Sequence, residues 1–306
     1  MQSRKIAIIG SGPAGWSAAI YAARGGMKPL VITGLEFGGQ ITKTNVLENY
    51  PGFSSQIDGV FLTEEMRKQA EAFGAEILAD SVVSVDLSAR PFVLRCDGGE
   101  EVEAEALIIA TGTAPRALGM PNESALVGHG VSYCATCDGF FFKGKDVVVV
   151  GGGNAAIYEA LHLAGVARRV YLVHRREEFR AESVNVARLR SMKNVEFALA
   201  YEVAEILENG GAVSGVRLAR VGGGESREIA ASAVFVSIGH NPNTALFSGQ
   251  IELDAGGYVA VKPGLCATSA EGVFAAGDVK SPRFRQVVIA AASGAQAAME
   301  ALELLN

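Results

Sequence analysis

The sequence has few cysteines and histidines, and this scarcity limits the kinds of site that it can build. Four residues of each type occur in 306 positions. Cys96 and Cys266 stand alone, and the histidines form no ligand-like pair. Only Cys134 and Cys137 lie close together, and a tetrahedral zinc site would need a second Cys/His pair. We therefore expect no metal site.

Excess positive charge and long apolar runs are also missing. The formal net charge is −6, which argues against nucleic acid or an anionic membrane as a general partner. No apolar run approaches the roughly 18 residues of a membrane span. The apolar segment Ile6–Ile9 leads into glycines and not into a signal-peptide cleavage site. The sequence thus predicts a soluble, cytoplasmic protein, long enough for two domains.

The two neighbouring cysteines form the motif Cys134-Ala135-Thr136-Cys137, and Asp138 follows directly. Two sulfurs at this spacing can close a small disulfide ring, and opening the ring yields two thiols in a two-electron step. A structural disulfide is the alternative, but so short a loop removes little entropy from the unfolded chain. The motif therefore favours a redox-active dithiol.

A glycine-rich turn lies near the start of the chain. The apolar segment Lys5–Ile9 reads as a buried strand, Gly10–Gly15 has the pattern G-x-G-x-x-G, and an alanine-rich helix follows to Arg24. Glycines in this position let backbone N–H groups approach a pyrophosphate at the positive end of the helix. The strand before the turn and the helix after it make dinucleotide binding the favoured interpretation.

The same pattern begins again in the middle of the chain. Gly151–Ala156 forms a G-x-G-x-x-A turn after the strand Lys145–Val150. The offset of 141 from Gly10 to Gly151 also relates Thr33 to His174, each at the end of a second strand. The two halves are therefore in register through a whole βαβ unit, which indicates an internal duplication of a dinucleotide-binding domain.

The ends of the two halves also repeat. Ala106–Pro115 corresponds to Ala233–Pro242 with a constant offset of 127. After Pro242 the chain continues with the apolar strand Gly272–Asp278 and a helix that ends near Leu305. If this last part rejoins the first domain, the second domain is inserted in it. Both crossings contain Gly and Pro, which suits a hinge.

The two halves differ where a dinucleotide-binding domain meets the adenosine ribose. The first half has Glu36 there, 21 residues after Gly15, and this acid could contact the first ligand's ribose. The second half has the basic segment His174–Arg180, and arginines favour a 2′-phosphate. The second domain is therefore expected to prefer NADP(H) to NAD(H). A solvated basic surface loop is the alternative.

Together, the segment Tyr133–Phe141, the second glycine turn and the segment His174–Arg180 resemble the low-molecular-weight thioredoxin reductases. The resemblance covers nearly the whole chain. It implies an α/β fold of two Rossmann-like dinucleotide-binding domains of the three-layer ββα type, the second inserted in the first. Residues 1–114 and 243–306 would form the FAD-binding domain. Residues 115–242 would form the NADPH-binding domain, which carries the disulfide.

The resemblance also implies which residues contact the cofactors. The flavin contacts would be Gly10, Ser11, Gly12, Pro13, Ala14, Gly15, Thr33, Gly34, Glu36, Gly38, Gly39, Gln40, Asn49, Val82, Thr111, Gly112, Gly277, Asp278, Arg285, Gln286 and Val287. The NADPH contacts would be Gly151, Gly153, Asn154, Ala155, His174, Arg175, Arg176 and Arg180.

The implied activity is that of an NADPH-dependent thioredoxin-disulfide reductase, a cytoplasmic homodimer with thioredoxin as its protein substrate. By resemblance, Cys137 faces the flavin ring and Cys134 attacks the partner, while Asp138 acts as the acid that protonates a thiolate. A helix cap or turn is the plainer role for Asp138. Because Cys137 and Gly151 lie only 14 residues apart, and the groups that they carry must meet one flavin, we expect the second domain to rotate between half-reactions.

The sequence departs from the family pattern in two places. It also leaves three other functions open. Tyr158 stands where family members usually have the first of two adjacent acids, although Glu159 remains, and no C-terminal cysteine pair of the larger reductase type is present. The alternative functions are a flavin-dependent reductase that serves a peroxiredoxin system, a reductase fed by ferredoxin, and a non-catalytic flavin-dithiol redox sensor. The arginines argue against ferredoxin, and the absence of an added thioredoxin-like domain argues against the peroxiredoxin system.

Overall fold

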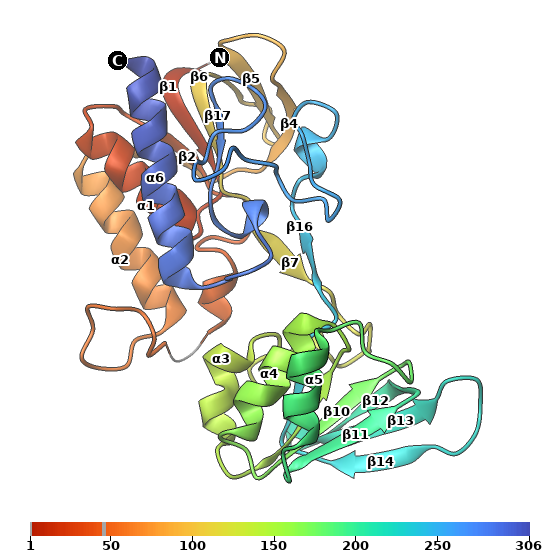
Figure 1. The fold of residues 1–306 in the computed structure, drawn as a ribbon. Coiled ribbons are helices and arrows are strands. Elements are labelled where there is room, and N and C mark those ends of the chain that lie inside the picture. Colours follow the sequence, from red (N-terminus) through yellow and green to blue (C-terminus); the bar gives the residue numbers. More distant parts are fainter. Residues whose placement is uncertain (1, 45–46) are drawn as a thin grey trace. The chain divides into compact units, whose positions relative to one another are not determined.

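The computed structural model of the protein describes residues 2–44 and 47–306. The chain divides into two compact units (Figure 1). The first unit consists of Met1–Ala114 and Asn241–Asn306, and the second consists of Pro115–His240. The second unit therefore interrupts the first in sequence.

The first unit is built on a mixed seven-stranded sheet with the order β3-β2-β1-β6-β5-β4, in which β17 also pairs with β6. The strands from β3 to β6 and β17 are parallel, and the β4–β5 hairpin is joined to β6 in antiparallel fashion. The strands of this sheet are β1 (Gln2–Ile9), β2 (Leu30–Ile32), β3 (Glu76–Leu78), β4 (Val82–Asp86), β5 (Phe92–Cys96), β6 (Glu101–Ile109) and β17 (Val273–Ala275). The helices of this unit are α1 (Pro13–Arg24), α2 (Gly59–Ala72), α6 (Val287–Leu305) and the 3-10 turns η1 (Gln40–Lys43), η4 (Ala245–Phe247) and η5 (Gly277–Lys280).

Strand β1 shows why this sheet has a layer on each face. Its last four residues are all buried, because alternate side chains of a strand point to opposite faces. Ile6 and Ile8 pack with Trp16 of α1 and with α6, whereas Ala7 and Ile9 pack with Phe92 of the hairpin. A strand that is covered on both faces is apolar throughout, which accounts for the unbroken apolar run before the first glycine turn.

The second unit repeats this arrangement with a parallel five-stranded sheet of order β11-β10-β9-β15-β8. One face packs on helix α4 and the other on the antiparallel sheet β12-β13-β14. The strands are β8 (Val131–Ser132), β9 (Asp146–Val150), β10 (Arg169–His174), β11 (Val195–Leu199), β12 (Tyr201–Asn209), β13 (Ala212–Arg220), β14 (Arg227–Ala230) and β15 (Ala233–Val236). The helices are α3 (Ala135–Asp138), α4 (Asn154–Ala164), α5 (Ser183–Arg190) and the 3-10 turns η2 (Ser124–Leu126) and η3 (Gly139–Phe142).

The sequence duplication reappears in the hydrogen bonds of the two sheets. Gly10 N donates to Ile32 O at 2.9 Å, and Gly151 N donates to Val173 O at 3.0 Å, which is the same bond 141 positions later (151 − 10; 173 − 32). The sheet order β3-β2-β1-β6 likewise matches β11-β10-β9-β15. The predicted fold class, two Rossmann-like domains in an α/β architecture, is confirmed.

The two segments that cross between the units are short strands that pair with each other. They are β7 (Thr113–Pro115) and β16 (His240–Pro242), which form a separate two-stranded sheet. On the side of the second unit, Arg116 N donates to Gly239 O at 3.0 Å. Both crossings therefore belong to one ladder and are not independent loops.

Helix α6 packs along helix α1 in the first unit (Figure 1). Their contact depends on Gly294, where a Cβ atom would lie 2.0 Å from the backbone oxygen of Ala14. By length and composition alone, α6 is the one helix within residues 2–44 and 47–306 that could span a membrane. Its small residues, among them Ala297, Ala298 and Ala301, are buried in the core of the unit. The buried share of its apolar window is 39%, so one face of α6 packs in the core of the unit.

Candidate redox and dinucleotide site

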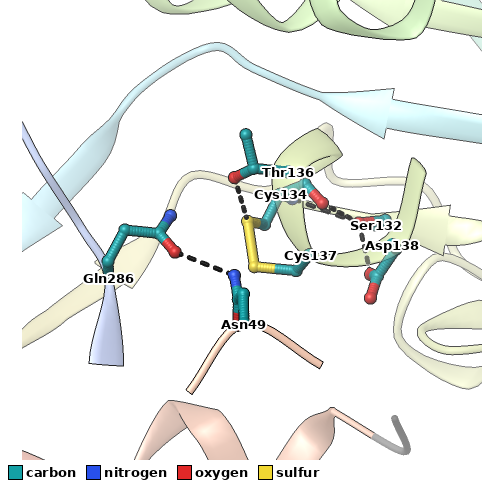
Figure 2. The surroundings of a disulfide bond; sticks show 7 residues. All are labelled: Asn49, Ser132, Cys134, Thr136, Cys137, Asp138 and Gln286. Carbon is teal, nitrogen blue, oxygen red and sulfur yellow. Dashed lines mark hydrogen bonds between the residues drawn. A yellow bond between two sulfur atoms is a disulfide. The ribbon is translucent and has the colours of Figure 1, made fainter. Parts of the chain in front are cut away.

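Cys134 and Cys137 form a disulfide at the start of helix α3 (Figure 2). Their Cα atoms lie 5.3 Å apart, within the range that a disulfide spans without moving the backbone. Cys134 O accepts hydrogen bonds from the backbone N–H groups of Cys137 at 3.2 Å and Asp138 at 3.1 Å. The Thr136 hydroxyl lies 3.3 Å from Cys134 Sγ. The motif thus forms one helical turn with both sulfurs on it.

Asp138 closes this turn, and its carboxyl group is partly buried. Burial raises the pKa of Asp138, and a hydrogen bond from Ser132 acts in the opposite direction. Ser132 Oγ donates to Asp138 Oδ2 at 2.6 Å (Figure 2). A carboxyl group whose pKa is raised keeps its proton to a higher pH, which suits it to proton donation. Asp138 is the N-cap residue of the 3-10 turn η3 (Gly139–Phe142), but its side chain makes no capping hydrogen bond there.

Tyr133 ties the disulfide segment to a buried carboxylate. Its hydroxyl donates to Glu123 Oε1 at 2.9 Å, and Glu123 is 3% exposed. The backbone N–H groups of Leu118, Gly119 and Met120 also donate to this carboxylate, at 2.9, 2.8 and 3.3 Å. Glu123 therefore organises the loop that follows crossing strand β7 and anchors the residue next to Cys134.

The glycine turn of the first unit has features that fit the pyrophosphate of a dinucleotide. Helix α1 begins after Gly12 without a side-chain cap, which leaves its first backbone N–H groups for a phosphate. Gly39 approaches this turn so closely that a Cβ atom on it would lie 3.2 Å from the Gly12 Cα atom. Ser11 Oγ joins the same loop by accepting from Gly38 N and donating to Thr33 O, each at 3.0 Å. The turn fits a pyrophosphate.

Other predicted flavin contacts follow the carboxyl ends of parallel strands, where such folds bind ligands. Thr111 and Gly112 follow β6, and Gly277 and Asp278 follow β17 at the start of η5. Burial raises the pKa of Asp278 to about 6, although the positive charge of Arg285 opposes the shift. A carboxyl group in this state can exchange hydrogen bonds with ligand hydroxyls.

The remaining predicted flavin contacts are less uniform. Asn49 Nδ2 donates to Gln286 Oε1 at 3.1 Å (Figure 2), next to the first residue of α6, Val287. The Glu36 carboxylate already accepts from Lys43 at 3.1 Å and from Gln40 at 3.2 Å. Gly34 N donates to the Asp80 carbonyl at 2.9 Å, two residues before the buried Val82.

The glycine turn of the second unit has the same open character. Helix α4 begins after Gly153 without a side-chain cap, and nothing lies within 4 Å of the position of a Cβ atom on Gly153. Gly151 packs against the next strand, since a Cβ atom there would lie 2.3 Å from Ser237 O. The side-chain oxygen of Asn154 accepts a hydrogen bond from Glu182 N at 2.8 Å. Asn154 and Ala155 are the first two residues of α4, so their backbone N–H groups are the ones that a phosphate at this helix end would meet. This turn also fits a pyrophosphate.

His174 joins this turn to the basic loop. Its ring occupies the space of a Cβ atom on Gly152, with ring atoms 2.2 to 2.4 Å from that position, and it stacks on Phe179 with ring centroids 5.5 Å apart. His174 Nε2 lies 3.2 Å from Glu178 O. Burial lowers the pKa of His174, against the hydrogen bond with Glu178, and the charges of the neighbouring arginines lower the pKa further. The His174 ring therefore packs between the glycine turn and the basic loop.

The arginines of this loop, Arg175, Arg176 and Arg180, are all exposed. None of them forms a salt bridge within residues 2–44 and 47–306. Arg180 N donates to Gly152 O at 2.9 Å, which holds the loop beside the glycine turn. Exposed guanidinium groups next to a glycine turn that fits a pyrophosphate suit an additional phosphate.

Several residues that shape these sites were not predicted from the sequence. Ser132, Tyr133 and Glu123 surround the disulfide segment, and Gly152 lies against His174. Gly152 could have been found, because it lies within the glycine motif. The partners of the other three residues depend on tertiary packing, and no local pattern marks them.

The architecture agrees with comparisons to known proteins. A family model for pyridine nucleotide-disulphide oxidoreductases matches residues 4–294. The chain belongs to this family. Within it, thioredoxin reductase of Rickettsia conorii is 48% identical over 304 residues, which are 99% of this chain and 98% of the relative. The resemblance to thioredoxin reductases drawn from the motifs is confirmed.

Other proteins that are similar to this chain differ in name. A Pseudomonas fluorescens protein named glucosaminate ammonia-lyase is 45% identical over 309 residues, 99% of this chain and 96% of its own length. Among solved structures, thioredoxin reductase from Giardia duodenalis superposes with a TM-score of 0.92 at 40% identity, covering 100% of this chain and 99% of its own. Relatives with similar sequence identity to this chain thus carry the names of different activities. Sequence identity alone therefore does not decide the activity, and the residues of the site must decide it.

Proposed function

We propose that the protein is an NADPH-dependent thioredoxin-disulfide reductase that uses FAD and the Cys134–Cys137 disulfide. The observation that carries this proposal is the disulfide itself, which lies beside a carboxyl group of raised pKa in a unit that also carries a glycine turn and three exposed arginines. The names of relatives such as the Rickettsia conorii protein support thioredoxin as the substrate.

In this proposal, the unit formed by Met1–Ala114 and Asn241–Asn306 binds FAD. Gly10–Gly15 would hold the pyrophosphate at the start of α1, and Asp278 would exchange hydrogen bonds with flavin hydroxyls. The Thr33–Gln40 loop, Asn49, Val82, Thr111-Gly112 and Arg285–Val287 complete the proposed contacts. When bound, FAD supplies the two-electron connection between NADPH and the disulfide.

The unit Pro115–His240 binds NADPH in this proposal. Gly151, Gly153, Asn154 and Ala155 would hold the pyrophosphate through backbone N–H groups. Arg175, Arg176 and Arg180 would bind the 2′-phosphate, since guanidinium groups pair with phosphate oxygens in bidentate fashion. His174, which packs between this loop and the glycine turn, would hold the three arginines in position beside the turn.

The reaction divides into a reducing and an exchanging stage. Two electrons break the S–S bond, and Asp138 gives its proton to one of the two sulfurs. The Cys134 thiolate then attacks the thioredoxin disulfide, which forms a mixed disulfide and releases one thioredoxin sulfur as a thiolate that takes up one proton from the solvent. Cys137 attacks the Cys134 sulfur, re-forms the original disulfide and releases the second thiol. Overall, NADPH, one proton and oxidised thioredoxin become NADP⁺ and reduced thioredoxin.

We also propose that the second unit rotates about the paired strands β7 and β16, so that the disulfide and the nicotinamide alternate at the flavin. The short, paired crossings support this proposal. A covalent crosslink between one engineered cysteine in each unit would test it. The half-reactions are expected to persist while turnover stops, and full turnover in the crosslinked protein would contradict rotation.

NADPH consumption tests the activity most directly. We expect consumption that requires added oxidised thioredoxin and that is lost in Cys137→Ser. Flavin reduction by NADPH without turnover would instead support the redox sensor. Release of ammonia from glucosaminate that persists in Cys137→Ser would support a lyase, as named for the Pseudomonas fluorescens relative.

Two further properties belong to the same proposal. The enzyme would act in the cytoplasm, where thioredoxin is kept reduced, and it would form a homodimer, as the family resemblance implies. Light scattering of the flavin-loaded protein would give the number of subunits, and a monomeric mass would contradict the dimer.

A further inference from the structure

Ser132 connects the proposed acid to the backbone of the first redox cysteine. It ends strand β8 and is only 4% exposed. Its hydroxyl donates to Asp138 Oδ2 at 2.6 Å and accepts from Cys134 N at 3.1 Å (Figure 2). The Cys134 carbonyl lies farther from this hydroxyl, at 3.3 Å, so the single hydroxyl proton is directed to Asp138. One buried hydroxyl group therefore sets the position of the carboxyl group relative to the disulfide.

The surroundings of Asp138 make this hydrogen bond important. Helix α4 and the turn η3 pack against α3. The turn η3 carries no titratable side chain, and the titratable residues of α4 are Tyr158, Glu159 and His162. Burial raises the pKa of Asp138, and the hydrogen bond from Ser132 is the interaction that lowers it. A donor to a carboxylate stabilises the charged form. Ser132 is thus the group that stabilises the Asp138 anion.

We propose that Ser132 is a positioning residue that holds Asp138 at the disulfide and stabilises the carboxylate left after Asp138 has given up its proton. The proposal rests on the proposed reductase function. In the step concerned, two electrons from the reductant enter the S–S bond and leave two sulfur anions. The proton of Asp138 moves to one of them, and the products are one thiol, one thiolate and one carboxylate that accepts a hydrogen bond from the Ser132 hydroxyl group.

Reduction of the disulfide by dithiothreitol tests this proposal without NADPH or thioredoxin. In that reaction dithiothreitol supplies the two electrons and becomes a cyclic disulfide, while Cys134 and Cys137 become thiols. The initial rate is measured against pH in the flavin-loaded protein and in Ser132→Ala, Ser132→Thr and Asp138→Asn. Dividing each rate by that of Asp138→Asn removes the titration of dithiothreitol itself.

The rate ratio of the unmodified protein is expected to fall as pH rises through the titration of Asp138. In Ser132→Ala, the low-pH ratio is expected to be lower by about tenfold, since a hydrogen bond to a charged group is lost, and the fall is expected to move to higher pH. Ser132→Thr keeps a hydroxyl and is expected to restore the original position of the fall. A loss of rate that is equal at every pH would be a merely structural effect and would overturn the proposal.

Two more outcomes separate this inference from the proposed function. If the rate ratio of the unmodified protein does not change with pH, Asp138 is not the acid and the role of Ser132 is refuted. If the dithiothreitol profiles shift as expected but NADPH does not reduce thioredoxin, the role of Ser132 stands and the reductase function fails. Infrared titration of the Asp138 carboxyl band, with Asp138→Asn subtracted, reports the same shift without relying on a rate. An unshifted band in a folded Ser132→Ala protein would refute the proposal.

Discussion

Thr111 and Asn243 lie 132 positions apart and hold each other by two reciprocal hydrogen bonds. The Thr111 hydroxyl donates to Asn243 O at 2.7 Å, and Asn243 Nδ2 donates to Thr111 O at 2.8 Å. Asn243 N also donates to Gly112 O at 3.0 Å. The two ends of the first unit from which the crossing strands depart are therefore fastened together.

Loss of this pair is expected to weaken the first unit. Asn243→Ala removes one hydrogen bond, which contributes about 1 kcal/mol, and should lower the thermal midpoint by about 2–4 °C for a unit of this size. Thr111→Ser keeps the donor and is the control. Calorimetry that shows equal midpoints for Asn243→Ala and the unmodified protein would contradict this account.

Arg176 tests the proposed 2′-phosphate site. Arg176→Ala should raise the KM for NADPH by about 10- to 100-fold, because a charge-assisted contact is worth about 1.5–3 kcal/mol. The KM for NADH should stay nearly unchanged, since NADH lacks the phosphate. Arg220, an exposed arginine of β13 that lies over Tyr201, provides a control: Arg220→Ala should change neither constant. An equal loss with both nucleotides would place Arg176 outside the phosphate site.

Gly152 and Gly153 form a matched pair for the packing of His174. A Cβ atom on Gly152 would lie 2.2 Å from the His174 ring, whereas a Cβ atom on Gly153 would meet nothing within 4 Å. Without nucleotide, Gly152→Ala should destabilise the protein by about 1–3 kcal/mol, as overpacking does. Gly153→Ala should stay within about 0.5 kcal/mol of the original. Equal thermal midpoints for the two variants would show that the ring moves aside without cost.

His174 should make stability depend on pH in a defined direction. Burial lowers the pKa of His174 from its ordinary value of 6.5, so the unfolded state binds a proton more readily than the folded state does. The stabilisation from His174 is therefore complete above pH 6.5 and is lost as pH falls toward the lower pKa of the folded protein. The difference in thermal midpoint between the unmodified protein and His174→Gln, measured from pH 5 to 8, should shrink on acidification. A difference in thermal midpoint that is constant with pH would show that folding does not lower the pKa of His174.

Glu123 and Tyr133 predict a graded effect next to the disulfide. Glu123→Gln replaces one carboxylate oxygen with an NH₂ group, and this new donor would face the three backbone N–H donors. The substitution should lower the free energy of unfolding by about 2 kcal/mol. Tyr133→Phe removes one hydrogen bond and leaves the three backbone bonds of the carboxylate intact, so it should cost about 1 kcal/mol. Denaturant unfolding of both variants measures the order, and a larger loss in Tyr133→Phe would refute the assignment of Glu123 as the organiser of the loop.

The sequence alone sufficed for the features that are local in the chain. A strand, a glycine turn and a helix follow one another within about 20 residues, and their side-chain pattern specifies both layers of the sheet. For the same reason the offset between Gly10 and Gly151 was visible before the matching hydrogen bonds were known. The cysteine spacing likewise allowed a disulfide because a single helical turn brings the two sulfurs together.

Tertiary structure decided which polar groups meet. No sequence pattern predicts the hydrogen bond between Glu123 and Tyr133, because the polar side chain of either residue could equally face water. The contact of Ser132 with Asp138 also depends on where a two-residue strand ends relative to α3. Periodicity reports which face of an element is buried, but a buried hydroxyl or carboxylate takes its role from partners that only the folded chain brings within hydrogen-bonding distance.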